Sequence, residues 1–205
     1  MIGFTYLCAC AHIFTIDKLY PIDRVVVCPK CHKRRAHSWI QTPVVWKETL
    51  MHDECKELMR HFVTKYIKGG ESVVDVGSGD VNGTFRPLFG SCKYTGVDLG
   101  EGENVDRVVE AYDWGDPEYD VLISGNCLEH VPDTVAWVEE SLRICKPGGL
   151  ICVVTPHSWP EHKFPVDCYR FFPDGLRWHY RTVNVLECWA GPFDTILIAR
   201  NEPAE

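Results

Sequence analysis

Hydrophobic and polar positions follow two different periods along the chain. Apolar residues recur every three or four positions in 47–67 and 134–145, and this spacing predicts two amphipathic helices. Short apolar runs bounded by glycine, proline or aspartate instead predict buried strands. Five such runs occupy residues 72–77, 94–98, 106–110, 119–124 and 150–155.

Local signals mark the ends of the second helix. Asp133 precedes it as a candidate N-cap, and the sequence KPGG at 146–149 predicts where it stops. Shorter helical segments are expected at 83–90, where Pro87 limits the helix, and at 173–180. The interval between the fifth strand and residue 173 is rich in proline, histidine and aromatic residues, so it is expected to be a loop.

The order of these segments indicates the fold class. Strands alternating with helices are typical of a doubly wound α/β sheet whose strands are mostly parallel. Two further strands, 182–190 and 195–201, are separated only by the turn-like sequence GPFD. They predict a C-terminal antiparallel hairpin and one antiparallel edge strand. The whole is expected to be a Rossmann-like, seven-stranded, mostly parallel sheet.

Composition and charge divide the chain further. Its 205 residues are 45% hydrophobic and 24% charged, and no apolar run approaches the about 18 residues that cross a bilayer. The start, MIGFTYLCACAHIF, lacks the basic segment of a signal peptide, so a cytoplasmic protein without membrane contact is expected. Residues 1–42 carry six basic and two acidic side chains, whereas the remainder carries 15 basic and 27 acidic ones. An acidic body disfavours a general nucleic-acid surface, so any polyanion is expected at residues 1–42.

The sequence VVDVGSGDVNG, residues 73–83, places three glycines where a strand passes to the next segment. Their spacing is one residue longer than the dinucleotide pattern G-x-G-x-x-G. Asp98 ends the next strand, 21 positions after Gly77, which is the usual distance for a carboxylate that binds ribose hydroxyls. The glycines alone also fit a tight turn, but together with Asp98 they predict a nucleotide-like ligand at this edge of the sheet.

Four segments in order carry a family resemblance. They are VVDVGSGDVNG, YTGVDLGEGENVDRVVEAYDW, YDVLISGNCLEHVPD and LRICKPGGLICVVTP, within residues 72–156. With the closing hairpin, this series resembles the class I S-adenosylmethionine-dependent methyltransferases of the type 11-like branch. The resemblance covers most of 45–200, assigns 43–205 to a methyltransferase domain (EC 2.1.1.-) and implies S-adenosyl-L-methionine as cofactor. A nicotinamide dehydrogenase is the rival hypothesis, disfavoured by the loop spacing and by EHVPD. Asp80 departs from the family, which usually has a hydrophobic or other polar residue after the second glycine.

The resemblance implies where the cofactor is bound. The loop 77–79 would face its methionine end, Asp98 its ribose and Glu110–Ala111 its adenine edge. The segment 124–126 would lie beside the sulfonium, and Asp75 would hold the loop or reach the amino group. The predicted cofactor-binding residues are Asp75, Gly77, Ser78, Gly79, Asp98, Leu99, Glu110, Ala111, Ser124 and Asn126.

Methyl transfer from a sulfonium is an in-line displacement. Positioning of the reactants supplies much of the acceleration, and a base sometimes takes the proton of the methyl acceptor. The candidate bases are His157, which follows the fifth strand, and His130, which follows the fourth. His157 is preferred, because the family's LEH motif generally has an architectural role. The segment 164–176 resembles the family's D-x-x-R-F-x-P-x-x-L stretch and implies a lid or an acceptor wall. Further polar and aromatic residues of this region are Trp159, His162, Asp167, Tyr169 and Arg170.

The identity of the methyl acceptor is less constrained. No N/D-P-P-Y/F motif follows the fourth strand, and no Pro-Cys pair is placed to attack a pyrimidine ring. These absences and the acidic body favour a small-molecule acceptor over nucleic acid or protein. A different class of function also fits the sequence: a non-catalytic, methyltransferase-like module that binds nucleic acid or protein through its N-terminal part.

The first 42 residues contain two cysteine pairs, CAC at 8–10 and CPKC at 28–31. Four thiolates at this spacing can close a tetrahedral, structural zinc site, and the pattern resembles a β zinc ribbon. A reduced hairpin with buried thiols is the alternative, and His12 or His32 can replace one cysteine. The basic run KCHKRRAH at 30–37 fits a solvated face, a phosphate contact or a protein partner. The predicted zinc ligands are Cys8, Cys10, Cys28 and Cys31.

Overall fold

The computed structural model describes residues 4–7, 13–16, 49–81, 83–116 and 119–204. The chain divides into two units, Met1–Lys47 and Glu48–Glu205. In the first unit, strands β1 (Phe4–Leu7) and β2 (Ile13–Ile16) pair in antiparallel fashion. The four predicted zinc ligands, Cys8, Cys10, Cys28 and Cys31, lie outside the described residues, so the zinc site stays a prediction.

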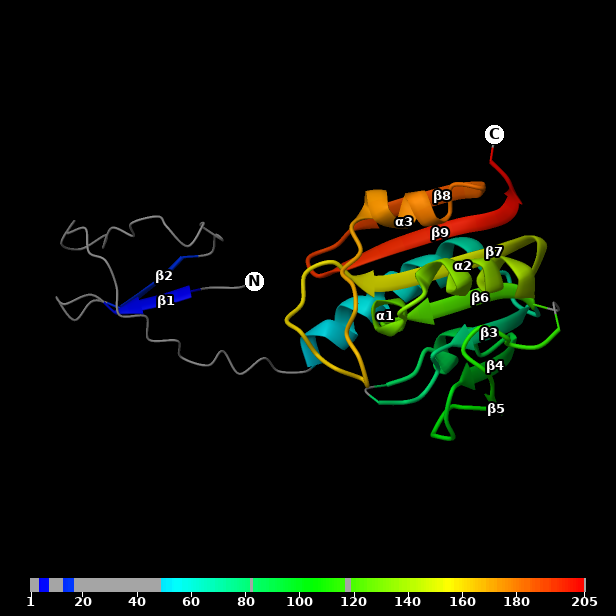
Figure 1. Ribbon diagram of the computed structural model, residues 1–205, viewed down its shortest axis with the longest axis horizontal. Coiled ribbons are helices and arrows are strands. Elements are labelled where there is room, and N and C mark those ends of the chain that lie inside the picture. The colour runs from blue at the N-terminus through cyan, green and yellow to red at the C-terminus, as the bar shows by residue number, and fades with distance from the viewer. Residues whose placement is uncertain (1–3, 8–12, 17–48, 82, 117–118, 205) are drawn as a thin grey trace. The chain divides into compact units, whose positions relative to one another are not determined.

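The second unit is built on a seven-stranded sheet with the order β5-β4-β3-β6-β7-β9-β8 (Figure 1). The pairings from β5 through β7 are parallel, and β9 is antiparallel to both of its neighbours. The predicted Rossmann-like α/β class is therefore confirmed for this unit. The strands are β3 (Ser72–Val76), β4 (Lys93–Asp98), β5 (Arg107–Val108), β6 (Tyr119–Gly125), β7 (Cys145–Pro156), β8 (Val183–Ala190) and β9 (Asp194–Pro203).

The C-terminal hairpin is confirmed, but the prediction of an antiparallel edge strand is wrong. The antiparallel strand β9 inserts between β7 and β8, and the edge strand β8 runs parallel to β7. Burial explains this order. The first six residues of β9 are all buried, whereas most of β8 is only partly covered. The more apolar strand thus takes the position that is covered on both sides.

Helices cover both faces of the sheet (Figure 1). Neighbouring strand residues point to opposite faces, so Val73 and Val74 belong to different cores. The core of Val73 contains Met59 and Phe62 of α1, whereas the core of Val74 contains Trp137 of α2 and Leu176 of α3. Among the helices that the structure describes, none combines the length and apolar character needed to cross a bilayer. The helices are α1 (Thr49–Tyr66), η1 (Arg86–Phe89), η2 (Leu128–His130), α2 (Thr134–Ile144) and α3 (Pro173–His179).

The two ends of α2 test the local predictions. Asp133 is the N-cap, because its side chain accepts a hydrogen bond from Ala136 N at 3.0 Å. At the other end, α2 ends at Ile144, directly before the predicted stop at 146–149, and these four residues belong to the start of β7, which begins at Cys145. Proline at 147 prevents the helix from continuing, and Gly148 has a φ of +78° that lets the strand bulge against β6.

The parallel strands β3, β4, β6 and β7 all end at one edge of the sheet. The loops that follow them start at residues 77, 99, 126 and 157. Ligands of open α/β sheets bind outside this edge, where neighbouring loops diverge. The candidate site is therefore built there.

Candidate active site

The glycine loop after β3 is fastened to the end of β4 by backbone hydrogen bonds. Gly77 N and Ser78 N both donate to Val97 O, at 3.0 and 3.1 Å. Gly77 has a φ of +79°, and a Cβ there would lie 2.6 Å from Cys127 Sγ. A residue with a side chain therefore meets both backbone strain and a collision at position 77. The loop needs its first glycine in order to pack against the segment that follows β6.

Two aspartates complete this loop. Asp98 Oδ2 accepts from Gly79 N at 2.9 Å, and Asp98 Oδ1 accepts from Leu99 N at 2.7 Å. Asp80 Oδ1 accepts from Gly83 N at 2.7 Å, so the residue that departs from the family pattern closes the turn. Asp98 is thus held at the edge of the sheet by two backbone amides.

A third carboxylate, Asp75, lies inside β3 just before the loop and is 2% exposed. Tyr94 donates a hydrogen bond to Asp75 Oδ2, whereas Oδ1 has no hydrogen-bond partner among the described residues. Burial raises the pKa of Asp75 to about 7, and the Tyr94 hydrogen bond offsets only part of this effect. Asn126, with a φ of +52°, also buries an oxygen without such a partner. These two unsatisfied acceptors fit a ligand that brings a positive charge and hydrogen-bond donors.

The edge of the sheet encloses a cavity of about 700 Å³. Two of the predicted cofactor residues do not line it. Ser124 is buried, and its hydroxyl donates to Val76 O at 2.8 Å, which links β6 to β3. Glu110 is exposed and forms an isolated antiparallel backbone bridge with Asp113. The predicted residues that do line it are Asp75, Gly77, Ser78, Gly79, Asp98, Leu99, Ala111 and Asn126.

Several lining residues carried no signal in the sequence. Trp137 belongs to the apolar side of α2, and Phe85 lies in the turn before η1. Their hydrophobic character is the same as that of core residues, so periodicity cannot separate the two roles. Tyr112 lines the cavity from the segment after β5. Only the tertiary arrangement brings these aromatic rings beside the glycine loop.

Of the two candidate bases, the structure brings only His130 to the cavity lining. His130 Nδ1 lies 2.5 Å from Val166 O, and because a carbonyl only accepts, this nitrogen carries the hydrogen. The lone pair of Nε2 is then free. Burial lowers the pKa of His130, and the nearby His162 lowers it further, to a smaller extent. Both effects favour the neutral ring. His157 instead places Nε2 3.0 Å from Gly191 O and its ring 5.7 Å from that of Phe172. Its role as a base stays a prediction without support from its position.

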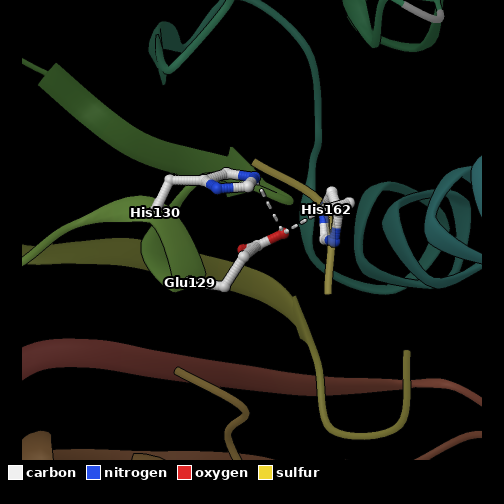
Figure 2. A group of neighbouring side chains, drawn as sticks. All are labelled: Glu129, His130 and His162. Atoms are coloured by element: carbon white, nitrogen blue, oxygen red, sulfur yellow. Dashed lines mark ion pairs between the residues drawn. The ribbon is translucent and has the colours of Figure 1, made fainter. Parts of the chain in front are cut away.

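Beside His130 lies the fully buried carboxylate of Glu129. Figure 2 shows both His130 and His162 turned towards the same oxygen of this group, at 3.7 and 3.9 Å from their Nε2 atoms. Thr155 Oγ1 donates to the other oxygen at 3.0 Å. Burial raises the pKa of Glu129 to about 7. Three polar groups thus meet at one end of the cavity, and two of them, His130 and His162, line it.

The loop that carries His162 is held by an ion pair. Arg170 donates to both oxygens of Asp167, at 2.5 and 2.7 Å. The Arg170 guanidinium lowers the pKa of Asp167 to about 2. Asp167 Oδ2 also accepts from the backbone N of His162 at 2.6 Å. Residues 162–165 line the cavity, so only the first two residues of the predicted wall 164–176 belong to its lining.

One more buried acid lies at this edge, at the start of β9. Asp194 is 0% exposed, and neither of its carboxylate oxygens has a hydrogen-bond partner among the described residues. Burial, reinforced by the negative charges of Glu54 and Glu129, raises the pKa of Asp194 to about 8. This carboxyl is therefore protonated in the folded protein at neutral pH.

The sheet order and the glycine loop define an α/β domain with a nucleotide-type cavity, and comparisons with known proteins narrow this class. The family described as "Methyltransferase domain" matches residues 48–185, which is more than half of the chain. The chain therefore belongs to the methyltransferase domain family.

An uncharacterized methyltransferase of Mycobacterium sp. (strain KMS) is 36% identical over 101 residues, which cover 42% of this chain and 39% of the relative. The chain thus matches about two fifths of the length of its curated relatives.

Solved structures share the fold. The 1,6-didemethyltoxoflavin-N1-methyltransferase of Burkholderia thailandensis, with bound 1,6-didemethyltoxoflavin and S-adenosylhomocysteine, superposes with a TM-score of 0.58 at 17% identity. The match covers 79% of this chain and 82% of that one. A SAM-dependent methyltransferase of Aquifex aeolicus gives a TM-score of 0.54 at 18% identity, over 72% and 89% of the two chains. At such identities the likeness shows the fold.

The first prediction concerns the glycine at position 77. We expect Gly77→Ala to lower the free energy of unfolding by about 1–3 kcal/mol, because alanine meets a positive φ and Cys127 Sγ. The matched control is Gly175→Ala on α3, where no heavy atom lies within 4 Å of the added Cβ. Urea unfolding of both variants measures the difference. Equal stability of the two variants would contradict the packing role of Gly77.

The second prediction concerns pH. Unfolded Asp194 loses its proton near pH 4, whereas the folded protein keeps it up to about pH 8. The wild type therefore loses stability relative to Asp194→Asn as the pH rises from 4 to 8, by at most about 1.4 kcal/mol per pH unit. Urea midpoints of both proteins at pH 5, 6.5 and 8 test this. A difference that does not change with pH would show that Asp194 is ionised in the folded state.

Proposed function

We propose that this chain is an S-adenosylmethionine-dependent methyltransferase that acts on a small-molecule acceptor. The observation that carries the proposal is the cavity at the carboxyl edge of the sheet. It joins the loop 77–79, the carboxylate of Asp98 and the unsatisfied oxygen of Asp75 in one lining. Membership of the methyltransferase domain family supports the reaction type.

The residues present fit this cofactor. Asp98 offers its carboxylate to a ribose, and the exposed Leu99 beside it offers an apolar surface. Asp75 and Asn126 offer buried acceptors to an amino acid end and a cationic centre. When bound, S-adenosylmethionine supplies a methyl group on a positively charged sulfonium. The chain itself contributes positioning, since a displacement of this kind depends on holding two reactants in line.

We propose that the acceptor binds in the part of the cavity between Asn126 and residues 162–165. The cavity volume of about 700 Å³ lies within the range of small-molecule sites. The acidic charge of residues 43–205 disfavours a polyanionic acceptor. The free Nε2 of His130 can take a proton from an acceptor or bind a Lewis acid.

For the first unit, we propose the structural zinc ribbon indicated by the sequence, with a role in recruiting substrate or a partner. The supporting observation is that β1 and β2 pair on either side of residues 8–12, which contain the first cysteine pair. A zinc knuckle at the tip of a hairpin has this order along the chain. The basic run at 30–37 offers a surface for phosphate or for an acidic protein.

The third prediction tests the cofactor. By isothermal titration we expect S-adenosylhomocysteine to bind the wild type, and Asp98→Ala to weaken binding at least tenfold, because the ribose acceptor is lost and the loop loses its bond at Gly79. Asp116→Ala, an exposed carboxylate outside the cavity lining, serves as the control. A tritiated methyl-transfer screen over metabolite, protein and nucleic-acid pools then identifies the acceptor.

The outcomes of this test separate the hypotheses. No binding of either S-adenosylmethionine or S-adenosylhomocysteine at millimolar concentration would refute the proposed function. Binding without methyl transfer to any pool would favour the non-catalytic module instead. Methyl transfer to nucleic acid alone would refute the small-molecule acceptor.

The fourth prediction concerns the ribbon. Elemental analysis of the purified chain is expected to find one structural zinc per chain that withstands dialysis against a weak chelator, because four thiolates enclose the ion. Replacing Cys28 and Cys31 by serine together should release it, whereas Cys92→Ser, outside the pairs, should not. A folded wild-type chain without zinc would refute the ribbon.

A further inference from the structure

A buried glutamate and two histidines meet at the acceptor end of the cavity. Glu129 and His130 belong to η2, directly after β6, and His162 comes from the loop after β7 (Figure 2). The carboxylate oxygen and the two ring nitrogens all lie within 4.8 Å of one another. Ligand atoms about 2.0–2.2 Å from one ion lie roughly 3–3.5 Å apart, so shifts of about 1 Å would bring the three onto a common ion.

The carboxylate of Glu129 lacks a partner on the side that faces the histidines. Its Oε2 accepts from Thr155 Oγ1, but its buried Oε1 has no hydrogen-bond partner among the described residues. A buried carboxylate oxygen without a partner is costly, and a bound cation removes that cost. The Nε2 atoms of His130 and His162 lie 3.7 and 3.9 Å from this Oε1.

Both histidines have the arrangement of metal ligands. His130 donates from Nδ1 to Val166 O, which leaves the lone pair of Nε2 on the side of Glu129. His162 Nδ1 lies 3.3 Å from Pro160 O and 3.5 Å from Asp167 Oδ2, and either oxygen can accept its hydrogen; Arg170 Nη2 lies 3.4 Å from the same nitrogen. Metal-binding histidines usually donate their other ring N–H to a carbonyl or carboxylate in this way.

We propose that Glu129, His130 and His162 bind a divalent transition-metal cation at the acceptor end of the cavity. Two imidazoles and one carboxylate suit first-row divalent ions. Three protein ligands leave positions open, as in catalytic metal sites and unlike the closed four-ligand structural sites. The open side faces the cavity, because His130 and His162 both line it.

The role of the cation rests on the proposed function and narrows the acceptor class. An open position takes an acceptor oxygen, because a hydroxyl keeps a lone pair for attack after it has bound, whereas an amine nitrogen does not. The bound hydroxyl gives its proton to solvent water. Its oxygen then forms the bond to the methyl carbon while the carbon–sulfur bond breaks and its electron pair stays on sulfur. His130 holds the cation in this scheme, and no protein base is required.

Titration of the full chain with Mn²⁺, followed by electron paramagnetic resonance of the free ion, tests the site. Mn²⁺ is the probe because the thiolates predicted in the first unit prefer softer ions. We expect one Mn²⁺ per chain outside those thiolates. Glu129→Gln and His162→Ala should each weaken its binding at least tenfold.

Two matched controls and one independent readout accompany the titration. Glu161→Gln replaces a carboxylate whose side chain is 71% exposed, one residue before His162, by a neutral amide. His61→Ala removes a histidine of α1 that bonds to Glu187. Both should bind Mn²⁺ like the wild type. The affinity of Glu129→Gln for S-adenosylhomocysteine should stay within twofold of the wild-type value, which shows that the variant is folded.

Water-proton relaxation by the bound Mn²⁺ tests the open position. Enhanced relaxation shows an exchanging water where an acceptor can bind, and the absence of enhancement would overturn the role in acceptor binding. Equal Mn²⁺ affinity in all variants, or no binding by the wild type, would overturn the cation site itself. If Mn²⁺ binding depends on Glu129 but S-adenosylhomocysteine does not bind, the cation site stands and the proposed methyltransferase function fails.

Discussion

Close packing of three strand ends without intervening side chains is the constraint on which the site depends. The amides of residues 77–79 bond to the end of β4 only because their backbone reaches it directly. A Cβ at Gly96 would lie 2.1 Å from Asn104 O, and one at Gly125 would lie 2.5 Å from the ring of Phe85. These glycines let the loops after β3, β4 and β6 converge, so the carboxylates and the cavity are placed by backbone geometry before any ligand contact is made.

Buried carboxylates give this edge of the sheet its electrostatic character. Asp75 is the last residue but one of β3, and Glu129 follows β6. Asp194 reaches the same edge because β9 runs antiparallel and pairs there with Pro156. Burial raises the pKa of all three towards or above neutrality, and each has an oxygen without a hydrogen-bond partner among the described residues. Such groups remain protonated until a positive charge arrives. A sulfonium and a divalent cation both meet this condition.

The strands, the capped helix and the glycine-loop part of the cavity lining could be predicted from the sequence, because they depend on local periodicity and on glycine spacing. The position of β9 was not predicted, since the hairpin signal shows that two strands pair but not which of them is inserted next to β7. Ser124 was predicted to lie beside the cofactor, yet its hydroxyl bonds to Val76 O, because side-chain direction depends on tertiary packing. His162 is 32 residues from His130, and only the path of the loop brings the two rings within 4.9 Å. Long-range contacts of this kind leave no periodic trace in a single sequence.

The inserted position of β9 also has a consequence for biogenesis. Strands β7 and β8 leave the ribosome before β9, yet they can join one sheet only through it. Until residues 194–203 are synthesised, the apolar edge of β7 has no partner and the nascent domain carries an open, aggregation-prone strand. Folding of this domain can therefore be completed only after β9 has been synthesised and has paired with β7 and β8.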